Sequence, residues 1–171
     1  MGVLYSNHMK FYFKLKSFVP LIIIFAFIIV FSEIASWWRQ VFSYQSIMID
    51  FMAGFFIVFG GFKLIKLSAF AEAYAMYDVV AKRSKLYAHI YPFLEIALGL
   101  AFLFRYQTIA VAWITLGLMI INSFGAYNGI RDKKVLMCAC LGTVFKLPMS
   151  YVSLGEDIMM ASMAILIILG T

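Results

Sequence analysis

The chain has 171 residues, of which 65% are hydrophobic and only 13% are charged. A soluble domain usually carries about 25% charged residues, so this composition excludes a water-soluble globular domain. The surplus apolar surface must face a lipid bilayer, and we predict an integral membrane protein. The net charge of +6 is distributed between apolar runs, which indicates membrane topology and not nucleic-acid binding.

Five apolar stretches approach the roughly 20 residues that a spanning helix needs. We predict an all-α, multi-pass transmembrane helical bundle in a single membrane domain (1–171), with spans at about 17–38, 47–67, 86–104, 106–128 and 153–170. The first stretch lacks a small-residue cleavage site at the right place, so we expect a retained helix and not a signal peptide. Gly129 is a candidate C-cap of the fourth helix, and Ser153 with Glu156 forms a capping box that would start the fifth.

Two connections are longer than turns. In the first, 68–85, the apolar residues recur at helical spacing, at Phe70, Tyr74, Tyr77 and Ala81. This stripe predicts a short amphipathic helix, either lying in the membrane interface or packed on the cytoplasmic end of the bundle. The second connection, 131–152, contains both cysteines of the chain.

The basic residues predict the orientation. Twelve of the 14 Lys and Arg residues fall on one side of the five predicted spans, and only Arg39 and Arg105 fall on the other. Basic loops stay in the cytoplasm, so we expect a cytoplasmic N-terminus and a C-terminus on the opposite side of the membrane. This orientation places the connection 131–152 at the cytoplasmic end, where a reducing environment keeps thiols reduced.

Cys138 and Cys140 are the most concentrated chemical signal. On a regular helix, side chains two residues apart point in different directions, so we expect a non-helical segment in which both sulfurs can meet. Three chemistries are open: binding of a soft metal ion such as Cu(I), Zn(II) or Hg(II), cycling between dithiol and disulfide, and a mixed disulfide with a partner. The alternative without chemistry is a pair of small apolar residues at the membrane edge.

Glu95 is the second candidate, because it lies at the centre of the third apolar stretch. A carboxylate at that depth is costly unless it is paired or protonated. We expect Glu95 to face the bundle interior, with Tyr91 and Asn122 as polar neighbours that share its proton. The other acidic residues near apolar stretches lie close to predicted helix ends, and we interpret them as helix-end charges: Glu33, Asp50, Glu156 and Asp157.

Two blocks of the sequence resemble the MauE-like branch of the DoxX-like membrane proteins. The first block contains Phe62–Leu64, Ala75–Asp78, Ala81–Ser84, Tyr91-Pro92 and Glu95–Gly99. The second contains Cys138–Gly142, Lys146–Pro148, Val152, Glu156-Asp157, Met159 and Met160. The combination is specific, although each short motif alone is not, and Ala139 stands where we expect Gly in the family motif.

The resemblance implies a four- or five-helix bundle in a bacterial inner membrane that takes part in redox processes. The namesake of the family serves the maturation of methylamine dehydrogenase with a thioredoxin-like partner. Carried onto this chain, the matching functional residues are Cys138 and Cys140. That maturation occurs outside the inner membrane, whereas the charge count places the cysteines at the cytoplasmic end. Either the segment re-enters the membrane, or the role here differs.

We therefore expect thiol-disulfide exchange or maturation of a partner protein through Cys138 and Cys140, with a thioredoxin-like partner. The runner-up is a protein that binds or transports a soft metal ion such as Cu or Hg through the same thiols, together with a metal-handling partner. A third interpretation is a structural subunit that anchors a partner in the membrane. The expected surroundings are the lipid bilayer, with no nucleic-acid partner.

Overall fold

The computed structural model describes residues 2–41, 43–131 and 149–170. These residues form six α-helices and no strand. In chain order the helices are α1 (Gly2–Trp38), α2 (Tyr44–Ile65), α3 (Leu67–Tyr77), α4 (Lys85–Leu103), α5 (Thr108–Arg131) and α6 (Met149–Leu169). Four helical stretches are long and apolar enough to cross a membrane: Val19–Trp38, Tyr44–Ile65, Lys85–Leu103 and Thr108–Arg131. The predicted all-α, multi-pass membrane bundle is confirmed.

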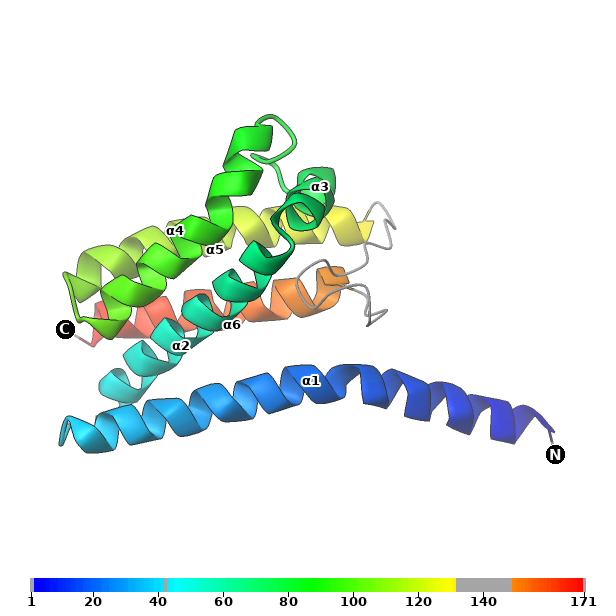
Figure 1. Ribbon diagram of the computed structural model, residues 1–171, viewed down its shortest axis with the longest axis horizontal. Coiled ribbons are helices and arrows are strands. Elements are labelled where there is room, and N and C mark those ends of the chain that lie inside the picture. Colours follow the sequence, from blue (N-terminus) through cyan, green and yellow to red (C-terminus); the bar gives the residue numbers. More distant parts are fainter. Residues whose placement is uncertain (1, 42, 132–148, 171) are drawn as a thin grey trace.

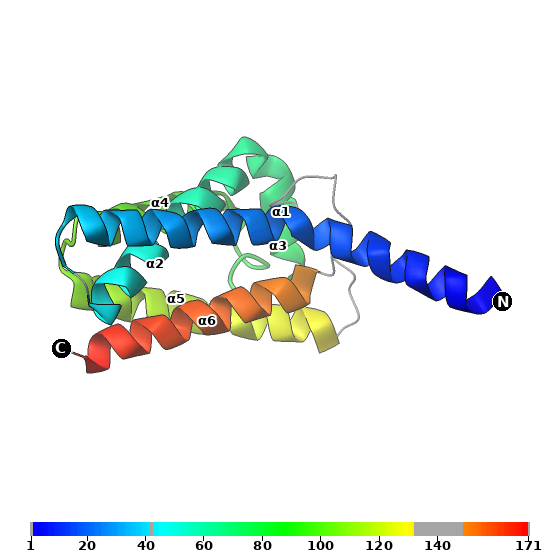
Figure 2. The same cartoon turned by 90° about the horizontal axis from the view of Figure 1, so that it is seen from below.

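The long helices run back and forth along the bundle between its two ends (Figure 1). At one end, α1 meets α2 and α4 meets α5; we call it the Asp50 end, after a residue buried there. At the other, the Lys63 end, α2 and α5 finish, α4 and α6 start, and α3 lies across the bundle. The two termini of the chain lie at opposite ends. Helix α6 lies antiparallel beside α5 in both views (Figure 2), while its membrane crossing stays a prediction.

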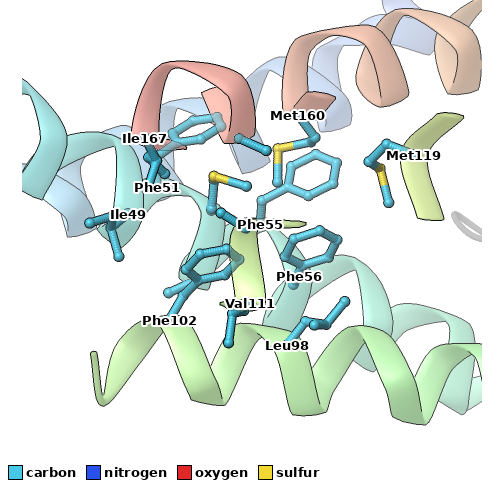
Figure 3. Close-up of a cluster of buried hydrophobic side chains, with 14 of the residues drawn as sticks. Ile49, Phe51, Phe55, Phe56, Leu98, Phe102, Val111, Met119, Met160 and Ile167 are labelled. Atoms are coloured by element: carbon cyan, nitrogen blue, oxygen red, sulfur yellow. The ribbon is translucent and has the colours of Figure 1, made fainter. Parts of the chain in front are cut away.

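Aromatic side chains fill the core between α2, α4 and α6. Figure 3 shows Phe56 of α2 close to Leu98 and Phe102 of α4, with Met160 of α6 nearby. The rings of Phe56 and Phe102 are stacked with centroids 6.4 Å apart. Lipid tails are as apolar as this core, so the hydrophobic effect does not favour the core over the lipid. The burial of these side chains therefore depends on close packing.

Glycines allow α2 and α4 to approach closely. A Cβ atom added at Gly99 would lie 3.0 Å from the backbone nitrogen of Ile57, and one at Gly60 would lie 3.2 Å from the carbonyl oxygen of Pro92. Small residues at such crossings are typical of membrane helix pairs, since they bring the backbones together. Helix α1 differs from the others, because among the described helices it packs against α2 alone.

The helix bounds differ from the expected ones in three places. Helix α6 begins at Met149 and not at Ser153, which suits Pro148 directly before it, because proline is tolerated just before or at a helix start. Helix α5 continues past Gly129 to Arg131, and Gly129 is buried, so this glycine serves packing and not termination. Helix α1 extends the first predicted span back to Gly2.

The predicted helix over 68–85 divides into α3 and a turn. The side chain of Asp78 ends α3, since its Oδ1 accepts hydrogen bonds from the backbone N–H groups of Val80 (2.9 Å) and Ala81 (2.7 Å). Phe70, Tyr74 and Ala81 are buried, and the ring of Phe70 stacks on Tyr91 of α4 with centroids 6.2 Å apart. The apolar stripe of α3 therefore packs on the bundle.

Candidate functional site

An ion pair joins α2 and α4 at the Lys63 end. Lys63 lies in the last turn of α2, and its Nζ pairs with Oε1 of Glu95 in α4. The side chains are 13% and 4% exposed, respectively, so both charges are removed from water. Gly60, one turn before Lys63, makes this approach possible, because a Cβ there would lie 3.3 Å from Cβ of Glu95. Removing two charges from water costs several kcal/mol per ion, and the pair offsets that cost only in part.

Two aromatic rings surround the ammonium group. Lys63 Nζ lies 5.4 Å from the ring centroid of Phe70 and 5.1 Å from that of Tyr91. At such distances the electron-rich face of a ring attracts a cation, more strongly when water is excluded. The ring faces hold Lys63 inward, and it does not snorkel toward the membrane surface as its place near the helix end suggested.

A hydrogen-bonded chain connects α3, α5 and α4 beside this pair. The hydroxyl group of Tyr74 donates to Oδ1 of Asn122 at 2.8 Å, and Nδ2 of Asn122 donates to the hydroxyl oxygen of Tyr91. All three side chains are buried. In a low-dielectric interior, such satisfied polar chains fix the relative positions of the helices that contribute them.

Asp157 of α6 adds a second carboxyl group. It is buried, and the charge of Lys63 acts on it as well as on Glu95. Asp157 Oδ2 and Glu95 Oε2 are both buried, and neither has a hydrogen-bond partner within 3.5 Å among the described residues. We call this group the lysine cluster; it takes one or two residues from each of five helices, and its members are Lys63, Tyr74, Tyr91, Glu95, Asn122 and Asp157.

The Asp50 end holds a cluster of opposite charge balance. Asp50 of α2 is fully buried, and its carboxylate pairs with Arg39 through Oδ1 and with Arg105 through Oδ2, the latter at 2.9 Å. Ser36 of α1 donates a further hydrogen bond to Oδ2 at 3.3 Å. We call Asp50, Arg39, Arg105 and Ser36 the arginine clasp.

The two arginines also bind backbone and hydroxyl oxygens of other segments. Arg39 donates to the carbonyl oxygen of Leu103 at 3.0 Å, and Arg105 donates to the hydroxyl oxygen of Ser46 at 2.8 Å. Arg105 has a positive φ of 56°, which an L-residue adopts only where the surroundings hold it. Partial burial lowers the pKa of Arg105, and the charge of Asp50 opposes this effect. The clasp fastens the ends of α1 and α4 to the start of α2.

Of the residues singled out from the sequence, the structure brings Glu95, Tyr91 and Asn122 together in one cluster. The ion-pair partner of Glu95 is Lys63, and Tyr91 acts on Glu95 through a side-chain hydrogen bond as well. That Tyr91 and Asn122 share the proton of Glu95 stays a prediction. Lys63 was missed because it lies close to a helix end. The spacing of Phe62-Lys63-Leu64 within an apolar run was the available signal, since a lysine there must find a partner or reach water.

Asp50 and Asp157 were also missed as site residues. Both were interpreted as helix-end charges, yet both are buried. Asp157 lies well inside α6, because that helix begins at Met149. Asp50 lies in the second turn of α2. Its ion-pair partners, Arg39 and Arg105, lie in two separate loops, so the pairing could not be read from the sequence around Asp50.

Cys138 and Cys140 lie outside the described residues, so the expected approach of their sulfurs stays a prediction. Within the described part of the chain, no group of three or more His, Cys, Asp or Glu side chains is placed to hold a metal ion. The two clusters are therefore ionic and hydrogen-bonded arrangements of single charged residues, each drawn from a different helix or loop.

Comparison with known proteins places these helices in a family. The family described as Methylamine utilisation protein MauE matches the chain over residues 43–170, which includes α2 to α6 and both polar clusters except Ser36 and Arg39. No curated protein and no solved structure matched the chain. Since the matched region covers well over half of the residues, and since the fold is an apolar helical bundle, the chain is a membrane protein that belongs to the MauE family.

Proposed function

We propose that this chain is a redox-associated protein of the bacterial inner membrane that exchanges disulfides with a partner protein through Cys138 and Cys140. One observation carries the proposal: Arg131 and Met149, which flank the cysteine-containing segment, both lie at the Lys63 end (Figure 1). Cys138 and Cys140 lie in the sequence between these two helix ends.

The chemistry needs only the two thiols and a partner disulfide. The thiolate of one cysteine attacks the partner's disulfide, forms a mixed disulfide and releases one partner thiolate, which takes up a proton. The second cysteine then attacks the mixed disulfide, so that Cys138 and Cys140 become a disulfide and the partner leaves as a dithiol. Two electrons and two protons pass to the partner. A disulfide across one intervening residue is strained and easily reduced, so it favours the reverse direction of this exchange, the oxidation of a partner dithiol, and does not suit structural support.

The partner that fits this chemistry is a thioredoxin-like protein, and the orientation decides where it acts. With the N-terminus in the cytoplasm, the Lys63 end and the cysteines face the cytosol, where a dithiol reductant can restore the thiols. A reporter fused after Thr171 tests this orientation. We expect activity only from a reporter that works after translocation; activity of a cytoplasmic reporter would contradict the orientation.

The test of the exchange reaction is a thiol titration of the purified protein. The chain has two cysteines in all, so alkylation followed by mass measurement counts its thiols without interference. In glutathione buffers of increasing oxidation, we expect both thiols to disappear together as an internal disulfide. Cys138→Ser and Cys140→Ser should each leave one thiol that forms a mixed disulfide with glutathione.

Two results would overturn the exchange proposal. One is a pair of thiols that stays unreactive through the whole range of buffers. The other is stoichiometric retention of Cu(I) or Hg(II) by thiols that then resist oxidation, which is the outcome that a soft-metal binding protein would give.

A further inference from the structure

The lysine cluster buries two carboxyl groups around one ammonium group. Lys63 pairs with Glu95, and its charge also acts on Asp157. If both carboxyl groups were ionised, the described part of the cluster would carry one uncompensated negative charge in the interior of a membrane protein. An isolated buried charge is so costly that the group takes up a proton instead.

The hydrogen bonding of the cluster also favours an added proton, because two of its acceptors lack a close hydrogen-bond donor among the described residues. Glu95 Oε2 and Asp157 Oδ2 are buried acceptors for which the described part of the chain supplies no hydrogen-bond donor within 3.5 Å. An ionised carboxylate only accepts hydrogen bonds, whereas a protonated carboxyl group carries an O–H donor. One proton on either acid would supply a donor to the cluster and would also remove the surplus charge.

We propose that Glu95 and Asp157 together bind one exchangeable proton, which makes the lysine cluster a proton-binding site inside the bundle. Lys63 keeps one of the two acids ionised, and the other acid holds the proton. Because the two carboxyl groups share one cation, their titrations are coupled and the proton belongs to the pair. This site is built from α2, α4 and α6 and does not depend on the cysteines.

The other titratable groups around the pair leave this balance intact or shift it further toward proton uptake. Tyrosine hydroxyl groups are neutral near neutral pH. The remaining charged neighbours among the described residues are acidic and act electrostatically on Asp157 from the turn after α3 and from α6. The neighbouring groups are Tyr74 of α3, Asp78 after α3, Tyr87 and Tyr91 of α4, and Glu156 of α6.

A proton fits the cluster better than a metal ion does. Zinc sites use at least three protein ligands, and the described residues offer no group of three acidic, His or Cys side chains. The cluster also already contains one cation, the ammonium of Lys63, which pairs with Glu95. A small monovalent cation in place of the proton remains an outcome that the experiment separates.

Infrared spectroscopy of the protein in lipid nanodiscs tests the site, because a protonated carboxyl group has a carbonyl band that a carboxylate lacks. Near neutral pH we expect a band equivalent to one protonated group, which shifts on exchange into heavy water. Glu95→Gln and Asp157→Asn should each remove it, since the acid that remains becomes the sole counterion of Lys63. Asp50→Asn is the matched control: Asp50 is equally buried but has two arginines, so the band should stay unchanged.

Removal of the cation gives an independent test that does not require either acid to be changed. In Lys63→Gln, both carboxyl groups lose their counterion, and we expect the carbonyl band to become roughly twice as large. If Lys63→Gln does not fold, the two acid variants still test the proposal. If the acid variants do not fold, Lys63→Gln still tests it.

Three results would overturn the proposal. The wild-type protein could lack the band, the band could persist in both acid variants, or it could appear only when sodium and ammonium ions are removed, which would indicate a bound cation. The variant with both cysteines replaced by serine should keep the band. A cysteine variant that keeps the band but exchanges no thiols leaves this site standing whatever happens to the proposed thiol-exchange function.

Discussion

The arginine clasp and the lysine cluster bury their carboxyl groups with opposite charge balance. Asp50 has two cationic partners, whose side chains are 32% and 28% exposed, whereas Glu95 pairs with Lys63 alone, which is 13% exposed, and the buried Asp157 forms no ion pair with a described residue. In the clasp, the cations keep contact with water while they neutralise the acid. In the cluster, the cation itself is buried between aromatic rings. Burial of a carboxyl group is common to both sites, and the ratio of acids to cations is what distinguishes them.

The two clusters also differ in what they hold together. The clasp connects loops, since Arg39 and Arg105 lie just outside helices and bind Asp50, Leu103 and Ser46. The cluster connects helices through their interior faces.

The largest effect should come from Asp50→Asn. This change leaves two partly buried arginines without their acid, and breaking buried pairs in this way costs roughly 3 kcal/mol of unfolding free energy. Reversible unfolding in mixed micelles measures it. The comparison predicts that Glu95→Gln costs clearly less, because Asp157 then takes over as the counterion of Lys63. Equal costs for the two variants would contradict the difference between the clusters.

A strong coupling between Glu95 and Asp157 is the next prediction. Each single change, Glu95→Gln or Asp157→Asn, leaves one acid for Lys63, but the double change leaves none. The double variant should therefore lose about 1–3 kcal/mol more than the sum of the single variants. The same micelle unfolding, run as a double-mutant cycle, gives the value. Additive costs would show that Lys63 serves Glu95 alone.

Close packing near the cluster gives a smaller effect with a matched control. In Gly60→Ala the new Cβ would lie 2.9 Å from Cγ1 of Ile96 and 3.2 Å from the Pro92 carbonyl oxygen, so α2 must shift away from α4. Such overpacking costs about 1–2 kcal/mol. Gly61→Ala adds the same atom next door, where nothing lies within 4 Å, and should be neutral or slightly stabilising. A loss of stability in Gly61→Ala equal to that in Gly60→Ala would contradict close packing at Gly60 as the cause, because alanine is favoured over glycine inside a helix.

Much of the fold was predictable because apolar runs of membrane length determine helices directly. The membrane class, the helical bundle and the interior place of Glu95 followed from composition and depth. The helix starts were less predictable. The capping box at Ser153 is a local signal, and the longer helix from Met149 overrides it. The end at Gly129 likewise gave way to close packing.

The partners within the site were not predictable from one sequence. Lys63 and Glu95 are 32 residues apart, and their pairing depends on how α2 crosses α4 at Gly60. Asp50 needs two arginines from two different loops, one of them at a positive φ. Such long-range pairs depend on helix packing angles, which hydrophobic periodicity does not encode.

The smallest predicted effect concerns the hydrogen-bonded chain beside the lysine cluster. Tyr74→Phe removes the hydroxyl donor to Oδ1 of Asn122 but keeps the ring, which lies 4.8 Å from the ring of Tyr91 between centroids. Hydrogen bonds between membrane helices contribute on average about 0.6 kcal/mol, so we expect a loss of that order. Tyr127→Phe on the exposed face of α5 is the control, since Tyr127 is 57% exposed, and should change stability less.

A double-mutant cycle that combines Tyr74→Phe with Asn122→Ala isolates the energy of the hydrogen bond itself. A coupling near zero would mean that ring stacking, and not the hydroxyl group, positions α3; a coupling well above 1 kcal/mol would mean that the tyrosines belong energetically to the lysine cluster. In either case the clasp at the other end should be unaffected, because no residue of this chain of hydrogen bonds contacts Asp50 or its arginines in the described structure.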